Sequence, residues 1–164
     1  MRIDHRFTLP ADVDRVMAMV ADPEYVADKI RRTGALEHTV DVSTDGPGPV
    51  IRTTRTMATD RLPQAARRLV GNGVTLTEEQ VWDAPAADGT RSGRLVVTAA
   101  GAPARLEADL RLEPRGEQTD FVTTGEFTVK VPFLGGQIEK QAEPYVGKVI
   151  GMEERASKDW LATH

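Results

Sequence analysis

Cysteine is absent from the 164-residue sequence. Its absence excludes disulfides, thiolate nucleophiles and Cys-based zinc sites. Histidine is scarce, because only His5, His38 and His164 occur, and no two of them share a spacing typical of metal ligands. The chain also has no glycine-rich phosphate loop and no Ser-His-Asp arrangement. We therefore expect no metal and no cofactor, and no catalytic residue can be assigned from motifs.

Long apolar runs are missing as well. No stretch approaches the roughly eighteen apolar residues of a membrane span, and the first twenty residues carry Asp4, Asp12 and Asp14 in place of the apolar core of a signal peptide. The net charge is −4, and the only basic doublets are Arg31-Arg32 and Arg67-Arg68, which argues against nucleic acid as a partner. We expect a cytoplasmic protein whose contact with a membrane, if any, is transient; its oligomeric state stays open.

The first 34 residues predict a strand followed by two short helices. Apolar and polar residues alternate from Ile3 to Leu9, as in a half-buried strand. Pro10 is suited to open the first helix, and Asp22-Pro23 to cap and open the second, which ends at Gly34. The residues expected to face inward from these helices are Val13, Val16, Met17, Val20, Tyr25, Val26 and Ile30.

For about a hundred residues after Gly34 the apolar pattern has the period of two that is typical of strands. Strands are predicted at 36–42, 50–58, 74–82, 95–99, 106–112 and 121–131, and the first is expected to point Leu36, His38, Val40 and Val42 inward. Turns rich in glycine, proline or charge separate most of them. Residues 62–71 break the pattern and predict a short helical turn or a lid-like loop.

A long amphipathic helix is predicted at the C-terminus, starting abruptly at Leu134-Gly135-Gly136. Its apolar stripe recurs every three or four positions and comprises Ile138, Ala142, Tyr145, Val149, Met152, Ala156 and Trp160. Pro144, Gly147 and Gly151 share the opposite face, where they would bend the helix convex toward solvent.

These elements predict an α+β, helix-grip fold in one domain, residues 1–164. It would be a curved antiparallel sheet of about seven strands around one long C-terminal helix, with two short helices after the first strand. A curved sheet laid against a single helix leaves a hollow between them. Such a hollow can hold a ligand.

This order of elements resembles the START-like (helix-grip) superfamily, which includes lipid-transfer domains and polyketide cyclases. Three segments, Leu62 to Gly71, Glu79 to Trp82 and Val131 to Lys140, are similar to an uncharacterised bacterial branch of it, a domain of unknown function. The resemblance implies a deep apolar cavity between the sheet and the long helix, and it assigns no reaction.

Polar residues on inward strand positions are the candidates for chemistry. Glu78 shares the parity of Trp82, so it would lie in a low-dielectric pocket with a raised pKa, or else pair with Arg52 or Arg55. Arg52 would suit an anionic ligand if it pointed inward. The residues predicted to line the cavity are His38, Arg52, Thr54, Glu78, Trp82, Leu110, Thr123, Phe127, Ile138, Ala142, Tyr145 and Val149.

Other polar residues allow two interpretations each. His5 and His38 are either satisfied core histidines or polar anchors for a ligand. Glu139 and Glu143 are either an acid-base pair or solvated charges near a helix N-terminus.

Three functions compete at this point. The first is non-catalytic binding or transport of a hydrophobic small molecule, such as a lipid, polyketide or isoprenoid. The second is a cyclase- or hydrolase-like enzyme that uses at least two of Glu78, His38 and Arg52 at a common ligand position. The third is a protein-interaction or regulatory module that docks a partner through residues 62–70. Whether the protein is an enzyme stays open.

Overall fold

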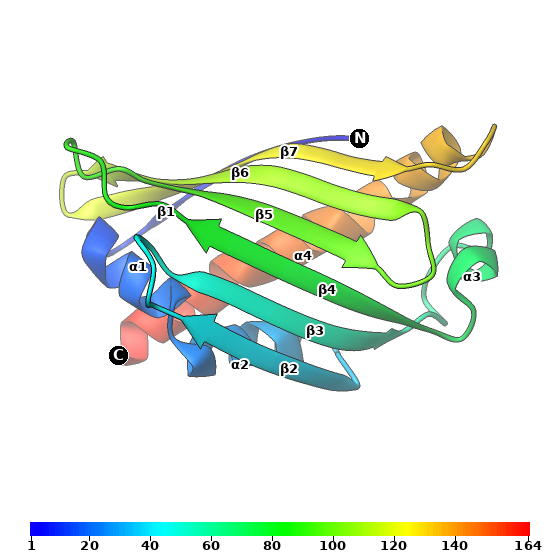
Figure 1. Cartoon of the computed structure of the whole chain (residues 1–164), viewed down its shortest axis with the longest axis horizontal. Coiled ribbons are helices and arrows are strands. Elements are labelled where there is room, and N and C mark those ends of the chain that lie inside the picture. The colour runs from blue at the N-terminus through cyan, green and yellow to red at the C-terminus, as the bar shows by residue number, and fades with distance from the viewer.

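The computed structural model describes all 164 residues. Seven strands form one antiparallel sheet in the order β1-β7-β6-β5-β4-β3-β2, and a long helix crosses one face of it (Figure 1). The strands are β1 (Arg2–Leu9), β2 (Glu37–Ser43), β3 (Val50–Ala58), β4 (Gly73–Trp82), β5 (Arg91–Ala99), β6 (Ala104–Arg115) and β7 (Gln118–Val129), and the helices are α1 (Val13–Val20), α2 (Pro23–Arg32), α3 (Gln64–Val70) and α4 (Gly135–Thr163). The predicted helix-grip α+β fold is confirmed.

The two ends of the sheet differ in what covers them. At one end, here called the α1 end, α1 and α2 lie on the same face of the sheet as the C-terminal part of α4 (Figure 1). At the other end, called the α3 end, α3 projects beyond the strands and only the N-terminal part of α4 crosses the sheet. The face of the sheet toward α4 is called the inner face.

The short helices begin at aspartate caps, which satisfy backbone N–H groups that have no partner within the helix. The Asp22 side chain accepts from the N–H of Glu24, and Pro23 occupies the first turn of α2, as predicted. Pro10, however, does not open α1. The cap is Asp12, whose side chain accepts from the N–H of Arg15, and Pro10 and Ala11 form a bend before it.

The core lies at the α1 end. Phe7, Phe121 and Leu112 occupy one cross-strand row on the inner face, and all three are buried. Trp82 packs edge-on against Phe121, with ring centroids 6.3 Å apart, and the apolar faces of α1 and α2 complete the cluster. The predicted inward residues of both helices belong to this core.

Several strand boundaries differ from the prediction. Leu36 is 66% exposed because β2 begins only at Glu37, although the N–H of Leu36 still donates to the carbonyl of Thr56. β5 begins earlier, at Arg91, and β7 ends at Val129, which leaves Val131 in the loop before α4. Side-chain alternation continues past the last ladder hydrogen bond, so it is a poor guide to where a strand ends.

Helix α4 begins at Gly135, as the glycine pair predicted, and runs through Pro144 without interruption. It packs against α1, α2, β1 and β7. Ile138 and Ala156 of its apolar stripe are buried, but Tyr145 and Val149 between them are 39% and 42% exposed. The helix is therefore held at its two ends and leaves apolar side chains uncovered in its middle. None of the four helices combines the length and the apolar character required to cross a membrane.

Candidate ligand site between the sheet and helix α4

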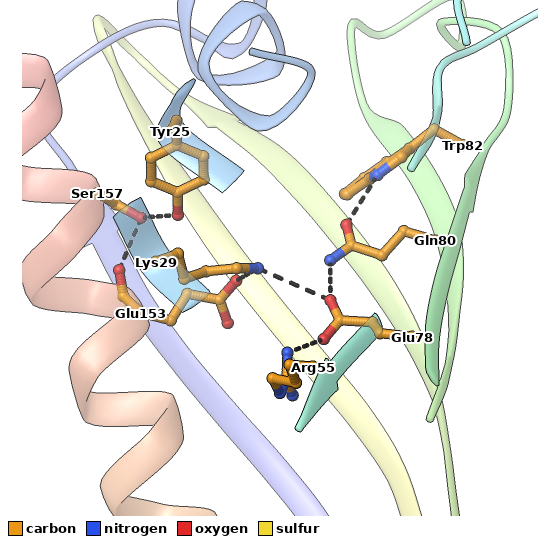
Figure 2. A network of polar contacts seen from close by, with 8 residues as sticks. All are labelled: Tyr25, Lys29, Arg55, Glu78, Gln80, Trp82, Glu153 and Ser157. Carbon is orange, nitrogen blue, oxygen red and sulfur yellow. Dashed lines mark hydrogen bonds and ion pairs between the residues drawn. The ribbon is translucent and has the colours of Figure 1, made fainter. Parts of the chain in front are cut away.

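Four charged side chains from four elements meet on the inner face, and we call them the charge cluster. Lys29 of α2 lies between two carboxylates, with Nζ 3.0 Å from Glu153 of α4 and 3.8 Å from Glu78 of β4 (Figure 2). The other carboxylate oxygen of Glu78 accepts from Arg55 of β3 at 3.0 Å. The cluster therefore contains two positive and two negative groups.

Neutral polar groups extend the charge cluster on both sides. The side-chain nitrogen Nε2 of Gln80 donates to Glu78 at 2.9 Å, and Nε1 of Trp82 donates to the side-chain oxygen Oε1 of Gln80 at 3.2 Å. On the helix side, the Tyr25 hydroxyl lies 2.8 Å from the Ser157 hydroxyl, which donates to the Glu153 carbonyl oxygen (Figure 2). This chain of hydrogen bonds ties β4, α2 and α4 together across the core.

Burial makes the pairing within the cluster strong, since its four side chains are only 10 to 22% exposed. Burial alone would raise the pKa of Glu78, but the charges of Lys29 and Arg55 and two hydrogen bonds lower it to about 2. The pKa of Lys29 is raised because Glu153 and Glu78 outweigh its desolvation. Burial raises the pKa of Tyr25 to about 12. Of the two alternatives for Glu78, the raised pKa is wrong and the ion pair with Arg55 is confirmed, and this pair forms on the inward side of the sheet.

Two of the residues predicted to line a cavity point away from α4. Arg52 lies on the outer face of the sheet, where its Nε donates to Glu79 at 2.7 Å, and both side chains are exposed. Thr54 shares that face and hydrogen-bonds Thr39 at 2.6 Å. In the Thr- and Arg-rich strand β3, neither of the two alternating sets of side chains is mainly apolar. The sequence therefore does not show which set faces inward, and only the pairing with β4 places Arg55 inward and Arg52 outward.

The other ten predicted residues lie on the inner face or along the stripe of α4. They differ in how far their side chains are exposed to solvent. Glu78 belongs to the charge cluster. Four are packed and leave no free surface, namely Trp82, Leu110, Thr123 and Ile138, whereas five are partly exposed, namely His38, Phe127, Ala142, Tyr145 and Val149.

An apolar inner surface continues from the charge cluster along the sheet. Val97, Leu106 and Phe127 stand in one cross-strand row with Glu78, through successive pairings of β4, β5, β6 and β7. All three apolar side chains are partly exposed although they lie on the covered face of the sheet. Tyr145 and Val149 of α4 are exposed as well, on the apolar stripe of the helix that crosses this face (Figure 1).

Tyr145 links α4 to the segment before α3. Its hydroxyl donates to the backbone carbonyl of Arg61, which lies between β3 and α3. No side chain of α3 is fully buried, and Leu62, Leu69 and Val70 are partly exposed. The contact made by Tyr145 thus crosses from the helix to the β3–β4 connection at the α3 end.

The two strand histidines differ in environment. The Nε2 atom of His5 is buried on the inner face without a hydrogen-bond partner, so His5 is not a fully satisfied core histidine. His38 is partly exposed at the edge strand β2, opposite Arg55. An unpartnered buried nitrogen is costly unless a water or ligand bonds to it.

The carboxylates at the start of α4 do not form an acid-base pair. Glu139 accepts from the N–H of Val129 at 2.8 Å and lies 3.0 Å from the Met1 amine, and these two groups lower its pKa. Glu143 is exposed. Glu139 therefore anchors the start of α4 to the end of β7.

Sequence reasoning missed three members of the charge cluster as site residues. Lys29 follows Tyr25 by one helical turn, which could have placed it on the inward side of α2. Arg55 was named only as a pairing alternative for Glu78, and Glu153 follows Met152 of the stripe without belonging to it. The sequence does not show that α2 and α4 bring the charges of Lys29 and Glu153 together beside Glu78 of β4.

A concavity of about 610 Å³ lies elsewhere, on the outer face of β4, β5 and β6. Most of its lining residues are polar or charged, among them Glu79, Arg94, Asp109 and Arg111. Since it is open and mostly polar, it offers little to an apolar ligand. The apolar inner surface is the better candidate.

Three solved structures share this architecture along almost the whole chain. The protein TTHA0849 of Thermus thermophilus is 17% identical, with a TM-score of 0.68 and all of both chains covered. The Zhui aromatase/cyclase of Streptomyces sp. R1128 is 16% identical, with a TM-score of 0.64, 97% of this chain and 92% of that chain covered. A START superfamily protein of Mycobacterium smegmatis is 13% identical, with a TM-score of 0.60 and 98% of both chains covered. At such identities the likeness shows a START-like fold alone.

No curated protein sequence matches the chain. A family model described as "Protein of unknown function (DUF2505)" matches residues 4–161.

Proposed function

The chain thus belongs to the DUF2505 family, and we propose that it binds a hydrophobic small molecule between the sheet and α4 without transforming it. The observation that carries the proposal is the exposure of Tyr145 and Val149 on the stripe of α4, since this helix crosses the sheet face on which Val97, Leu106 and Phe127 are also partly exposed. Apolar side chains at such positions are normally buried by their own chain. A bound apolar molecule would cover them and gain about 25 cal/mol per Å² of apolar surface removed from water.

The charge cluster sets the inner limit of the proposed site. Toward the α1 end, Lys29, Glu78 and Glu153 join sheet to helix and the packed core follows. Toward the α3 end, Tyr145 is the contact from α4 to the β3–β4 connection. A ligand would lie between these two contacts.

Binding without catalysis is favoured because the ionisable groups are already engaged. Glu78 is held as a carboxylate by Lys29, Arg55 and Gln80, and a pKa of about 2 makes it a poor general base near neutral pH. The enzyme hypothesis required at least two of Glu78, His38 and Arg52 to converge. Arg52 lies on the other face of the sheet, where it pairs with Glu79.

The proposal predicts that Val149→Asp lowers the affinity for an apolar fluorescent probe such as 1-anilinonaphthalene-8-sulfonate at least about tenfold. The new carboxylate would have to lose water beside the bound probe, and each tenfold corresponds to about 1.4 kcal/mol. Fluorescence titration of wild type and variant measures the change. Since Val149 is already partly exposed, the variant is expected to fold.

The matched control is Gln137→Asp, which adds the same charge to an exposed position of the same helix. We expect its probe affinity to stay within about twofold of wild type, because little buried apolar surface lies beside it. Equal affinities in wild type and Val149→Asp, with the fold intact by circular dichroism, would refute binding at this surface.

A further inference from the structure

The loop between β7 and α4 exposes two large apolar side chains at its tip. Phe133 is fully exposed and Leu134 is 48% exposed. Phe133 also has φ of +64°, a backbone conformation that is rare and strained for a bulky residue. The loop is nonetheless held firmly, since the N–H groups of Leu134 and Gly135 both donate to the carbonyl of Val131. Neither the core nor the ligand site uses Phe133.

Charge is divided between the two ends of the sheet. The connections at the α3 end, residues 33–36, 59–72, 100–103 and 130–134, contain four basic residues, Arg61, Arg67, Arg68 and Lys130, and one acidic residue, Asp60. The connections at the α1 end, residues 10–12, 44–49, 83–90 and 116–117, contain no basic residue and five acidic ones, Asp12, Asp45, Asp83, Asp88 and Glu117.

The basic residues of the α3 end are free to meet a partner. All four are exposed, and none of them forms an ion pair within the chain. By contrast, the exposed arginines of the outer sheet face are neutralised, as Arg52 is by Glu79 and Arg105 by Glu107. A chain with a net charge of −4 thus presents one positively charged end.

Apolar groups share this basic end with the charges. Phe133 and Leu134 lie there together with Leu36, which is also largely exposed, and the connection 100–103 consists only of Ala, Gly and Pro. In Figure 1, α3 and the β7–α4 loop both project beyond the right-hand end of the sheet. This combination of exposed aromatic and aliphatic tips with unpaired basic residues matches the chemistry of an anionic lipid surface.

We infer that the α3 end docks onto anionic lipid bilayers, with Phe133 and Leu134 entering the headgroup region and the four basic residues contacting lipid phosphates. Docking would orient the molecule, because the acidic α1 end is repelled by the same surface. The inference goes beyond the proposed ligand site and does not depend on it, since vesicle binding requires no ligand.

Cosedimentation with vesicles tests the inference. The wild-type protein is expected to bind phosphatidylcholine vesicles that contain phosphatidylglycerol, to lose that binding as salt screens the charges, and to ignore vesicles of phosphatidylcholine alone. Phe133→Gly is expected to weaken binding about tenfold. Its folded state should not suffer, because glycine adopts positive φ without strain.

A charge-matched pair of variants separates local docking from net charge. Arg67→Gln with Arg68→Gln is expected to weaken vesicle binding at least about tenfold. Arg52→Gln with Arg111→Gln changes the net charge equally on the outer face, farther from the α3 end, and is expected to leave binding within about twofold of wild type.

Three outcomes would overturn the inference. One is wild-type protein that does not bind anionic vesicles at low salt, and another is equal loss of binding in both double variants. The third is a dimer of the wild-type chain that Phe133→Gly dissociates, as measured by sedimentation, because a second copy would then cover this end. Loss of probe binding in Val149→Asp bears only on the ligand site.

Discussion

Replacing Lys29 with methionine is expected to lower the free energy of unfolding by about 3–5 kcal/mol at neutral pH. Lys29 is the cation that separates Glu153 from Glu78, at 3.0 and 3.8 Å. Without it, Glu153 loses its only ion-pair partner and faces a second carboxylate in a largely buried space. Methionine keeps the length of the side chain, so the loss reflects charge more than packing. Urea denaturation measures the effect.

The control for Lys29→Met is Lys158→Met. Lys158 lies 2.6 Å from Glu154 one turn earlier on α4, and both side chains are substantially exposed. Exposed pairs contribute about 1 kcal/mol or less. Adding Glu153→Gln to Lys29→Met should recover part of the lost stability, because the unpaired carboxylate is then gone. If Lys29→Met cost no more than Lys158→Met, the charge cluster would not link sheet to helix as described.

Stability is expected to fall as the pH is lowered from about 4.5 toward 2, and Glu78 is responsible for much of the decrease. Its pKa in the folded protein is about 2, against an ordinary value of 4.5. A carboxylate with a lowered folded-state pKa contributes stability that is present above its ordinary pKa and is lost as the pH falls through the folded value. The contribution at neutral pH is on the order of 3 kcal/mol.

Glu78→Gln should therefore remove most of this slope, because glutamine does not titrate. The measurement is the free energy of unfolding by urea at several pH values between about 2 and 6, compared with wild type. Glu79→Gln is the matched control, since Glu79 is the next residue, points to the outer face and is largely exposed beside Arg52. An unchanged slope in Glu78→Gln would mean that Glu78 is not the titrating group.

The strands and the terminal helix could be predicted from the sequence because their signals are local. Alternation from Ile3 to Leu9 and the stripe from Ile138 to Trp160 each correspond to one element of the structure. The predicted ends of elements were wrong where they depend on contacts with other parts of the chain. Leu36 continues the alternation but precedes the first ladder pair of β2, and Pro10 lies two residues before the true cap of α1.

The site was less predictable because it depends on tertiary placement. In β3 both parities are polar, so the choice between Arg52 and Arg55 follows only from the pairing of Arg55 with Leu76 of β4. Lys29 and Glu153 are more than a hundred residues apart and meet only because α2 packs against α4. Charged residues on helix surfaces are usually solvated, so neither stands out in the sequence.

Packing explains why the expectation of a deep cavity needs refinement. The α1 end of the space between sheet and helix is filled by the core around Trp82 and Phe121, and the charge cluster closes it. On the α3 side, Leu106, Phe127 and Val149 stay partly exposed. The proposed ligand site is therefore the α3 half of the space, and its polar boundary is the charge cluster.

Native mass spectrometry of protein purified without detergent or denaturant tests the proposed binding of an apolar ligand most directly. We expect a population whose mass exceeds that of the chain by one small molecule, which organic solvent releases and which Val149→Asp does not retain. A single species at the mass of the bare chain, unchanged after incubation with a lipid extract of the expression host, would contradict it.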